Sequence, residues 1–452
     1  MSPPVSSAVS VARALQAAQE TRCLELGHGV LGRSAEVFRQ FFPGKPARVV
    51  ADPNTFEAAG KKVFGALRGA GCVCREPFIF NDPDLYAEHR YVVALEAALK
   101  GDDAIPVAVG SGTINDLSKL ASHRTGRPYM CVATAASVDG YTAYAASITY
   151  QGSKQNFDCP APTAVIADLD VLCAAPPEMN SAGYADLLAK VPAGADWILA
   201  DALGAEPIHP EAWNIVQGGL RAALAHPEGV PKGDPAAIGP LIEGLMLCGF
   251  AMQAARVTRP ASGAEHQFSH LWDMQHHTHA GKAPSHGFKV GIGTLAISAL
   301  YEYLLGLPLN AIDIDSCCAQ WLDEKTRDAR IHELFGETDL APVALSESRA
   351  KWLDRAALKT QLQTLRRLWP DLKERLRRQL LPVAELKKML DAAGAPIEPE
   401  QIGISRLRLR KSFWPAFFMR RRFTVLDLAV RVGVLESGLN HVFGPQGPWP
   451  IR

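Results

Sequence analysis

The stretch IPVAVGSGTINDLSKLA, residues 105–121, joins an apolar strand pattern to a helix pattern through a Gly-Ser-Gly turn. Gly110 and Gly112 allow the backbone to approach a ligand closely and to adopt dihedral angles closed to other residues. The helix that follows offers backbone N–H groups and the positive end of its dipole to an anion such as a pyrophosphate. The turn is neither a complete GxGxxG motif nor a Walker A loop. It predicts a nucleotide site, with a plain strand-to-helix turn as the alternative.

Further β-rich runs surround this stretch in the first part of the chain. The expected strands are Ala47–Ala51, Pro77–Phe80, Ile105–Val109, Tyr129–Ala133 and Ala164–Asp168. Helical patterns lie between them, at Thr55–Ala70, Ala87–Leu99 and Asn115–His123. Strands that alternate with helices predict a parallel sheet covered on both faces.

Beyond residue 175 the strand patterns almost vanish. Helical periodicity continues at Ser181–Leu203, Leu241–Arg256, His286–Leu305 and Arg349–Arg378. We therefore expect an N-terminal Rossmann-like α/β domain over residues 1–175, which binds the nucleotide. An all-α domain over residues 176–452 is expected to carry the metal and the substrate.

The composition is that of an ordinary globular protein. The chain has 452 residues, 47 of them Lys or Arg and 47 Asp or Glu. Apolar residues make up 48% of the chain and charged residues 21%, which excludes a disordered chain. The equal charges exclude a protein that binds nucleic acid through bulk positive charge. The nine cysteines form no CxxC pair, which favours a reducing compartment. No secretory signal is evident, and the most apolar window, Ala236–Ala255, contains Pro240 and Glu243. These features predict a cytoplasmic protein without a transmembrane segment.

Two other loops of the first part follow apolar strands. Asp52 ends the run ARVVAD, where a carboxylate can accept the ribose hydroxyls of an adenosine and disfavour a 2′-phosphate. A helix cap ahead of Asn54 is the alternative for Asp52. The loop TAASVDG, residues 134–140, offers small hydroxyl residues and Asp139 to a cofactor or a polyol. A Ser/Asp-rich turn is the alternative for this loop.

An acid and several histidines in the second part predict a metal site. Asp186 lies among apolar neighbours in SAGYADLLAK, and a buried acid needs a partner. His266 and His270 are four residues apart, so on a helix their imidazoles share one face. His286 opens a further helix pattern, and one carboxylate with two or three imidazoles suits Zn²⁺, Ni²⁺ or Fe²⁺. Three more histidines crowd the same region as alternative ligands, and they are His276, His277 and His279.

The run RLRLRKSFWPAFFMRRR, residues 406–422, holds seven basic residues and no acidic one. A solvated helical face is the simpler interpretation. A contact with a membrane surface or an anionic partner is the alternative.

Several motifs occur in a fixed order along the chain. They are GSGTINDLSK, TAASVDG, VIADLDVL with its APPEM continuation, AGYADLLAK, GAEHQFSH and SHGFKVGIGT. Together they resemble the sn-glycerol-1-phosphate dehydrogenases of the iron-containing alcohol dehydrogenase and dehydroquinate synthase-like superfamily. The resemblance covers roughly residues 45–300 and implies the fold of that superfamily.

The resemblance also implies roles for individual residues. Asp186, His266 and His286 become the metal ligands, and His270, Asp139 and Asp186 contact the substrate. The dinucleotide is expected on two loops, at Gly110, Ser111, Gly112, Thr113 and Ile114 and at Thr134, Ala135, Ala136 and Ser137. Family members often carry a serine four residues after the aspartate of the DG motif, but this chain has Ala143 there. Ser147 or Thr142 is a candidate to replace that contact.

The implied reaction is the NAD(P)-dependent interconversion of dihydroxyacetone phosphate and sn-glycerol 1-phosphate. A divalent metal, Zn, Ni or Fe, polarises the carbonyl while the nicotinamide carries the hydride. His270 or a metal-bound water is the proton donor, and Lys154 and Lys289 are candidates to contact the phosphate. The rivals are a glycerol or polyol dehydrogenase, a dehydroquinate synthase-like enzyme, and a non-catalytic nucleotide- or metal-binding module. The large helical part leads us to expect a homo-oligomer, most simply a dimer.

Overall fold

The structure, a computed structural model, describes residues 11–151, 153–336 and 338–451. The chain divides into two compact units. The first unit comprises Met1–Leu187, Pro210–Ala261 and Ala392–Ala395, and the second comprises Leu188–His209, Ser262–Asp391 and Pro396–Arg452. The domain boundary expected at residue 175 stays a prediction.

A six-stranded parallel sheet forms the centre of the first unit, with the strand order β1-β8-β5-β4-β2-β3. Its strands are β1 (Cys23–Gly27), β2 (Ala47–Ala51), β3 (Phe78–Ile79), β4 (Ile105–Gly110), β5 (Met130–Ala133) and β8 (Ala164–Asp168). A separate antiparallel hairpin consists of β6 (Ala146–Tyr150) and β7 (Ser153–Phe157). All five expected strands are confirmed, and β1 and the hairpin are additions.

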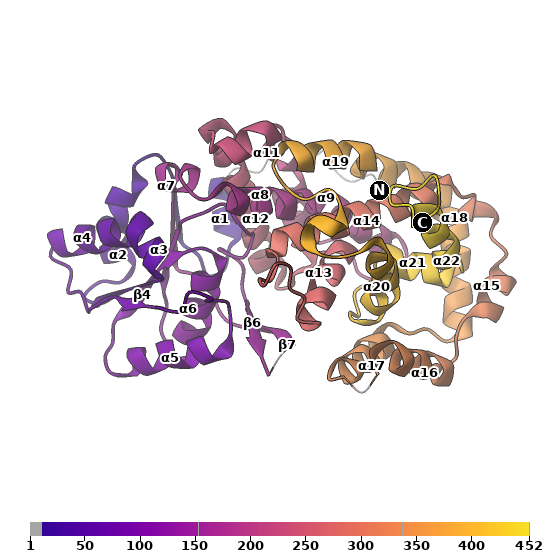
Figure 1. The fold of residues 1–452 in the computed structure, drawn as a ribbon, viewed down its shortest axis with the longest axis horizontal. Coiled ribbons are helices and arrows are strands. Elements are labelled where there is room, and N and C mark those ends of the chain that lie inside the picture. The colour runs from indigo at the N-terminus through magenta and orange to yellow at the C-terminus, as the bar shows by residue number, and fades with distance from the viewer. Residues whose placement is uncertain (1–10, 152, 337, 452) are drawn as a thin grey trace. The chain divides into compact units, whose positions relative to one another are not determined.

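Helices cover both faces of this sheet. The helices of the first unit are α1 (Val11–Ala17), α2 (Ser34–Phe41), α3 (Pro53–Thr55), α4 (Lys61–Gly69), α5 (His89–Lys100), α6 (Gly112–Arg124), α7 (Leu169–Cys173), α8 (Pro177–Leu188), α10 (Pro210–Gln217), α11 (Leu220–Ala223) and α12 (Pro235–Ala255). Figure 1 shows α2 and α4 on one side of β4 and α5 and α6 on the other. Val49 and Val107 pack in one buried cluster with Phe38 of α2 and Val63 of α4. Val50 points to the opposite face because side chains alternate along a strand.

The loops after β2 and β4 lie at the place where the strand order reverses. From β2 the chain continues outward to β3, and it then returns to β4 on the other side of β2. In open α/β sheets, ligands bind beyond the carboxyl ends of the strands at such a reversal. Asp52 follows β2 and Ser111 follows β4, so two of the expected cofactor residues end neighbouring strands.

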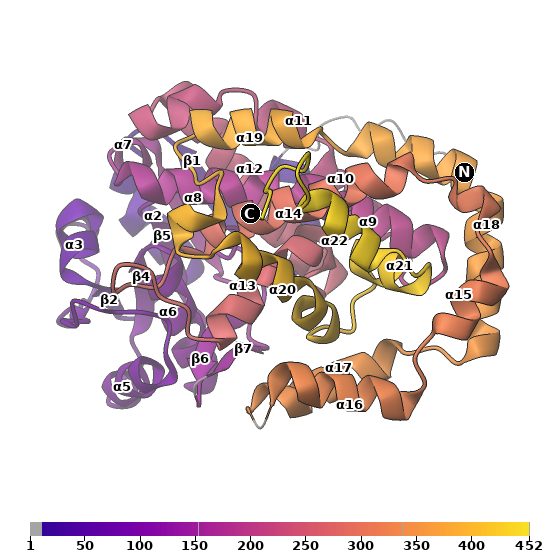
Figure 2. The same cartoon turned by 45° about the vertical axis from the view of Figure 1, so that its right-hand side comes forward.

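The described part of the second unit is helical and contains no strand. Its helices are α9 (Lys190–Ala202), α13 (Ala264–Met274), α14 (His286–Gly306), α15 (Ile314–Gln320), α16 (Glu324–Phe335), α17 (Leu340–Lys351), α18 (Arg355–Gln379), α19 (Val383–Ala392), α20 (Arg406–Phe418), α21 (Val425–Arg431) and α22 (Leu435–Val442). Figure 2 shows α16 and α17 side by side below α20.

Two of the long helical patterns are each divided in the structure. The pattern 181–203 becomes α8 and α9, which are separated at Ala189. The pattern 349–378 is interrupted before α18, where the Asp354 carboxylate caps the new helix by accepting the N–H of Ala357. The sequence pattern marked neither break, because apolar residues continue in the sequence on both sides of each one.

Two helices, α12 and α14, are long and apolar enough to cross a membrane. However, 67% of the most apolar window of α12 and 83% of that of α14 are buried inside the protein. Such burial is typical of core helices, as expected for residues 236–255.

Candidate cofactor loops and metal centre

The glycine turn between β4 and α6 is built by close packing. Neither Gly110 nor Gly112 has a positive φ, so the expected unusual dihedral angles are not found. Instead, a Cβ on Gly110 would lie 2.5 Å from the Cβ of Ile114, and a Cβ on Gly112 would lie 2.7 Å from Val138. Ser111 is the N-cap of α6, yet its side chain caps no backbone N–H. The turn therefore needs small residues for space rather than for backbone conformation.

The expected cofactor residues of this turn differ in exposure. Ile114 is buried at 1% exposure, so its side chain supports the turn. Ser111 and Thr113 are partly exposed beside it. Ile114 is therefore suited to contact a ligand through its backbone and not through its side chain. Ser111 and Thr113 can offer their hydroxyl groups as well as their backbone.

The second cofactor loop, residues 134–137, is held by α8. The N–H of Ala136 donates to the Asn180 side-chain oxygen at 2.8 Å. A Cβ on Gly183 would lie 1.8 Å from the Ala136 carbonyl oxygen, so only glycine allows this approach. One helical stripe of α8 thus fixes the loop that follows β5.

The same stripe of α8 also carries Asp186. Its Oδ2 accepts the backbone N–H of Asp139 at 3.1 Å. Asp186 is fully buried and Asp139 is buried at 8% exposure. Because Asn180, Gly183 and Asp186 repeat every third residue, α8 arranges the loop and the two carboxylates together.

Lys119 fixes the segment after the DG motif. Its ammonium group is buried at 1% exposure and donates to the carbonyl oxygens of Gly140, Ala143 and Ala145 at 3.0, 2.8 and 3.0 Å. An ammonium has three donors, and here each donor has an acceptor. Asn115 adds a bond from its amide to Gly140 at 3.2 Å. Both residues belong to the motif that predicted the glycine turn, but their role in positioning this segment was missed.

A carboxylate lies beside this ammonium. Burial raises the pKa of Asp116, while Lys119 and Lys154 favour its charged form. The carboxylate Oδ2 accepts the backbone N–H of Ser147 at 3.3 Å, which ties β6 to α6.

Thr142 and Ser147, the two candidates to replace the serine expected at position 143, differ in their hydrogen bonds. Thr142 is fully buried, and its hydroxyl donates to the Met246 carbonyl at 2.7 Å. Its role is therefore to attach the segment to α12. The Ser147 hydroxyl is buried and has no hydrogen-bond partner among the described residues. Of the two, only Ser147 keeps a hydroxyl to offer.

Asp52 caps a helix. Its Oδ1 accepts the N–H groups of Asn54 at 2.8 Å and Thr55 at 3.0 Å, and the Thr55 hydroxyl accepts the Asp52 N–H in return. The alternative interpretation as a cap is confirmed. Both bonds to the carboxylate use Oδ1, so the cap by itself does not exclude a ribose contact through Oδ2.

The three expected metal ligands converge. Asp186, His266 and His286 each offer one ligand atom, and these atoms all lie within 4.8 Å of one another. The ring centroids of His266 and His286 are 5.3 Å apart. His270 lies close by, with its ring 6.3 Å from that of His266 and 6.2 Å from that of His286. One carboxylate and two imidazoles form a suitable donor set for a divalent transition metal.

The two candidate ligand histidines have partners on α13. The Nδ1 of His266 lies 2.8 Å from the Glu265 carboxylate, and the Nδ1 of His286 lies 3.2 Å from the Ser269 hydroxyl. These bonds leave the Nε2 atoms for a cation, which is how metal-binding histidines are usually held. The sequence analysis missed Glu265, although an acid directly before His266 was a usable signal.

Asp196 fixes the start of α13. This fully buried carboxylate accepts the N–H of Ala264 at 2.8 Å, the Tyr301 hydroxyl at 2.6 Å and the N–H of Val425 at 2.8 Å. It therefore connects α9, α13, α14 and α21 within the second unit. The position of His266, two residues into α13, depends on this attachment.

The other three histidines lie outside the cluster. His277 is buried, with Nε2 2.7 Å from the Ile402 carbonyl and Nδ1 2.8 Å from the Arg408 guanidinium. Since a carbonyl only accepts and a guanidinium only donates, His277 carries its proton on Nε2. His276 and His279 are exposed. Among the described residues, the structure thus favours His266 and His286 over these alternatives.

The two lysines expected to contact phosphate face acids. Lys289 is buried at 3% exposure and its ammonium donates to Asp273. Lys154 lies in β7 and stabilises the charged form of Asp116. Their contact with a phosphate stays a prediction, and the ion pair makes Lys289 the weaker candidate.

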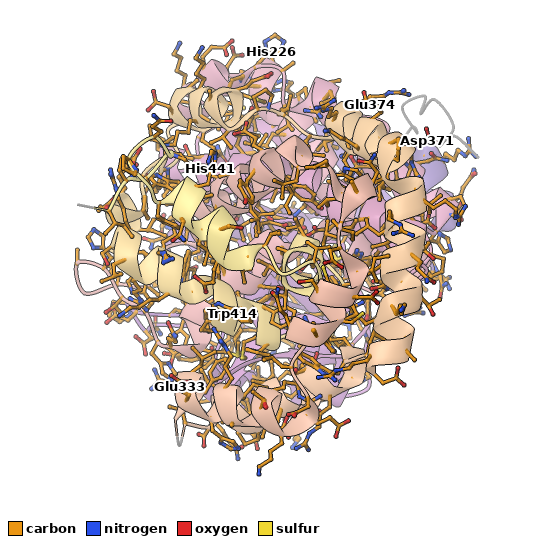
Figure 3. The ribbon with its side chains drawn as sticks, turned by 90° about the vertical axis from the view of Figure 1, so that its right-hand side faces the viewer. His226, Glu333, Asp371, Glu374, Trp414 and His441 are labelled. Atoms are coloured by element: carbon orange, nitrogen blue, oxygen red, sulfur yellow. The ribbon has the colours of Figure 1, made fainter. Side chains whose placement is uncertain are left out.

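The basic run of 406–422 is engaged by neighbouring groups. Arg406 pairs with Glu398 at 3.3 Å, Arg410 with Glu436 at 3.3 Å, and Arg421 with Glu347 at 2.5 Å. Trp414 of α20, labelled in Figure 3, donates its indole N–H to the Glu436 carboxylate at 2.6 Å. These internal pairs favour the structural interpretation over a membrane contact.

Comparisons with known proteins give the fold and the family of the chain. The iron-containing alcohol dehydrogenase family matches residues 25–176. A probable glycerol dehydrogenase from Sinorhizobium meliloti has the same fold, with a TM-score of 0.59 at 16% identity over 93% of this chain and 95% of that one. The iron-containing alcohol dehydrogenase of Thermococcus thioreducens matches with a TM-score of 0.57 at 14% identity, over 93% and 98% of the two chains. The expected fold class, a Rossmann-like α/β part with an all-α part, is confirmed.

More similar relatives narrow the class. The glycerol-1-phosphate dehydrogenase (NAD(P)+) of Halalkalibacterium halodurans is 35% identical over 66% of this chain and 76% of its own length. The protein of the same name from Geobacillus stearothermophilus is 30% identical over 84% of this chain and 85% of its own. The chain therefore belongs to the glycerol-1-phosphate dehydrogenase family of iron-containing alcohol dehydrogenases. It is an enzyme of the oxidoreductase class, and the resemblance seen in the motifs is confirmed.

Proposed function

We propose that this enzyme reduces dihydroxyacetone phosphate to sn-glycerol 1-phosphate with NAD(P)H and needs one divalent cation, Zn²⁺, Ni²⁺ or Fe²⁺. The convergence of Asp186, His266 and His286 within 4.8 Å is the observation that carries the proposal. It is supported by relatives whose name gives both the substrate and the cofactor.

The dinucleotide is assigned to the two loops that end β4 and β5. Backbone N–H groups at the start of α6 suit the pyrophosphate, with Ser111 and Thr113 beside them. The loop of Thr134, Ala135, Ala136 and Ser137 continues this surface, and α8 holds it in place. The Asp52 Oδ2 is assigned to the adenosine ribose, and the Ser147 hydroxyl to the contact that Ala143 cannot make.

The cation is assigned to Asp186, His266 and His286. When bound, it supplies a Lewis acid that polarises the substrate carbonyl and stabilises the charge that develops on its oxygen. These residues would hold it in a largely buried setting, since Asp186 is fully buried and His266 is 5% exposed. Low exposure strengthens every electrostatic contact in the site.

The remaining chemistry is assigned to His270 and Asp139. His270 lies beside both ligand imidazoles, where its ring can donate a proton to the reduced oxygen. Asp139 is fixed by its backbone bond to Asp186 and can accept a substrate hydroxyl. The phosphate needs cationic or N–H donors, and Lys154 is the candidate that we retain.

The test is an assay of the full chain before and after removal of metal with a chelator. We expect NADH oxidation with dihydroxyacetone phosphate, its loss on chelation, and its return with Zn²⁺, Ni²⁺ or Fe²⁺. In the reverse direction, the sn-1 isomer of glycerol phosphate should react and the sn-3 isomer should not.

Assays of the same protein with other substrates distinguish this function from the rival functions. Faster turnover of unphosphorylated dihydroxyacetone would identify a glycerol or polyol dehydrogenase, and conversion of the dehydroquinate synthase substrate would identify that enzyme. Binding of NADH without turnover of any triose would indicate a non-catalytic module. The dimeric state and the cytoplasmic location stay predictions of the sequence.

A further inference from the structure

Two side chains of α13 each hold the ring of one candidate ligand histidine. Glu265 is 2.8 Å from Nδ1 of His266, and Ser269 is 3.2 Å from Nδ1 of His286. Glu265 and Ser269 are four residues apart, so they lie one turn apart on the same face of the helix. One short helix thus provides a ligand and the partners of two ligands.

The Glu265 side chain is enclosed on all sides. It is fully buried, and its Oε1 also accepts the N–H of Gly263 at 2.6 Å. A Cβ on Gly263 would lie 2.7 Å from the Glu265 Oε2, and a Cβ on Gly293 would lie 2.5 Å from the Glu265 carbonyl oxygen. A glycine is therefore needed at 263 to leave room for the Glu265 carboxylate and at 293 to leave room for the Glu265 backbone.

The two partners differ in what they demand of an imidazole. An ionised carboxylate only accepts, so Glu265 requires a proton on Nδ1 of His266 and leaves a lone pair on Nε2. The Ser269 hydroxyl can donate or accept, so it tolerates either tautomer of His286. Selection of the metal-binding tautomer is consequently stronger at His266.

The burial of the Glu265 carboxylate also favours a cation nearby. Its Oε2 is buried without a hydrogen-bond partner among the described residues, and the one ion-pair partner found there is His266. A buried carboxylate in this state is costly unless positive charge is near. With Asp186, Glu265 supplies two negative charges, which match the charge of one divalent cation.

We propose that Glu265 is a positioning residue that sets the metal affinity of this enzyme by fixing His266 and by balancing the charge of the cation. The inference rests on the metal centre of the proposed function. Carboxylates in this position typically change metal affinity or activity 10- to 100-fold.

The experiment measures Zn²⁺ affinity by competition with a chelator, on the full chain stripped of metal. Glu265→Gln keeps the size of the side chain and an acceptor oxygen but removes the charge, and we expect about 10- to 100-fold weaker Zn²⁺ binding. Ser269→Ala should weaken binding less, because its partner is neutral. Gln267→Ala is the matched control, since Gln267 is a buried polar residue of the same helix whose amide has no hydrogen-bond partner in the part of the chain that the structure describes.

Each outcome of this experiment either supports or overturns the role of Glu265. Unchanged Zn²⁺ affinity in Glu265→Gln, or an equal loss in Gln267→Ala, overturns the inference. Melting temperatures of the metal-free Glu265→Gln, Ser269→Ala and Gln267→Ala variants show whether a loss of affinity reflects unfolding. A wild-type chain that binds Zn²⁺ but does not reduce dihydroxyacetone phosphate would overturn the proposed substrate and leave this inference standing.

Discussion

Two segments of the helical unit are each rich in one kind of charged or titratable side chain. In the histidine segment, residues 266–286, the imidazoles of His266, His270 and His286 gather within 6.3 Å of one another. In the basic segment, residues 406–422, Arg406, Arg410 and Arg421 pair with acids from three different places in the chain. A cluster in sequence marks a site when its functional atoms face one another, and it stabilises the fold when each member has its own partner.

Replacing a convergent histidine should have the largest effect. We expect His266→Ala to lose bound metal and to lower turnover by about 1,000-fold or more, since a bound cation would lower the activation barrier by several kcal/mol. Metal analysis and NADH oxidation on the same sample measure both quantities. Retention of metal and turnover would contradict the ligand assignment, and the histidine segment would then no longer count as a metal site.

His277 tests whether the histidine segment is uniform. Its ring bonds to Ile402 and Arg408 resemble those of the basic segment, so His277→Ala should cost about 1–3 kcal/mol of unfolding free energy. Metal content should not change. Chemical denaturation and metal analysis measure the two effects, and loss of metal with stability intact would place His277 in the metal site.

The same variant has a predicted pH dependence. Burial lowers the pKa of His277 below its ordinary value of 6.5, so the unfolded chain binds this proton more readily than the folded one. Stability from this group is therefore present above the unfolded pKa and falls as the pH drops below it. The difference in stability between wild type and His277→Ala should shrink in mildly acidic buffer.

A single change in the basic segment should have the smallest effect. Arg410 pairs with Glu436 and Asn440 at the surface, so Arg410→Ala should cost at most about 1 kcal/mol. Lys411, an exposed neighbour, serves as the control and should cost less. Activity should stay unchanged, and neither the wild type nor the variant should sediment with anionic vesicles. Sedimentation that depends on Arg410 would restore the membrane interpretation.

The parts of the fold that follow from local pattern were predictable from the sequence. The strands β2, β4, β5 and β8 are buried apolar runs, and their pattern marks them directly. Strand β1 was missed because its residues CLELG are all partly exposed and form no apolar run. The hairpin of β6 and β7 was missed because its residues are mostly polar or partly exposed.

Less of the candidate site than of the fold could be predicted from the residues themselves. Ligand identities came from the resemblance, while the spacing of the residues left several histidines open. The role of Lys119 could not be predicted, because its acceptors are backbone carbonyls 21, 24 and 26 residues away. Backbone acceptors leave no signature in the side chains of a sequence. The dihedral argument for the glycines of the turn was wrong, and their close packing against Ile114 and Val138 could not be predicted because it is a tertiary property.

Lys119 holds the path of residues 140–145 through the carbonyl oxygens of Gly140, Ala143 and Ala145. These acceptors belong to the main chain, so the Ala143 side chain takes no part in holding this path, whereas the Tyr141 and Thr142 hydroxyls make bonds of their own. Position 143 can therefore lack the serine that the resemblance predicts there and still keep its anchor. It is also the place in this segment where protein engineers can vary a side chain while the main chain beneath it stays held.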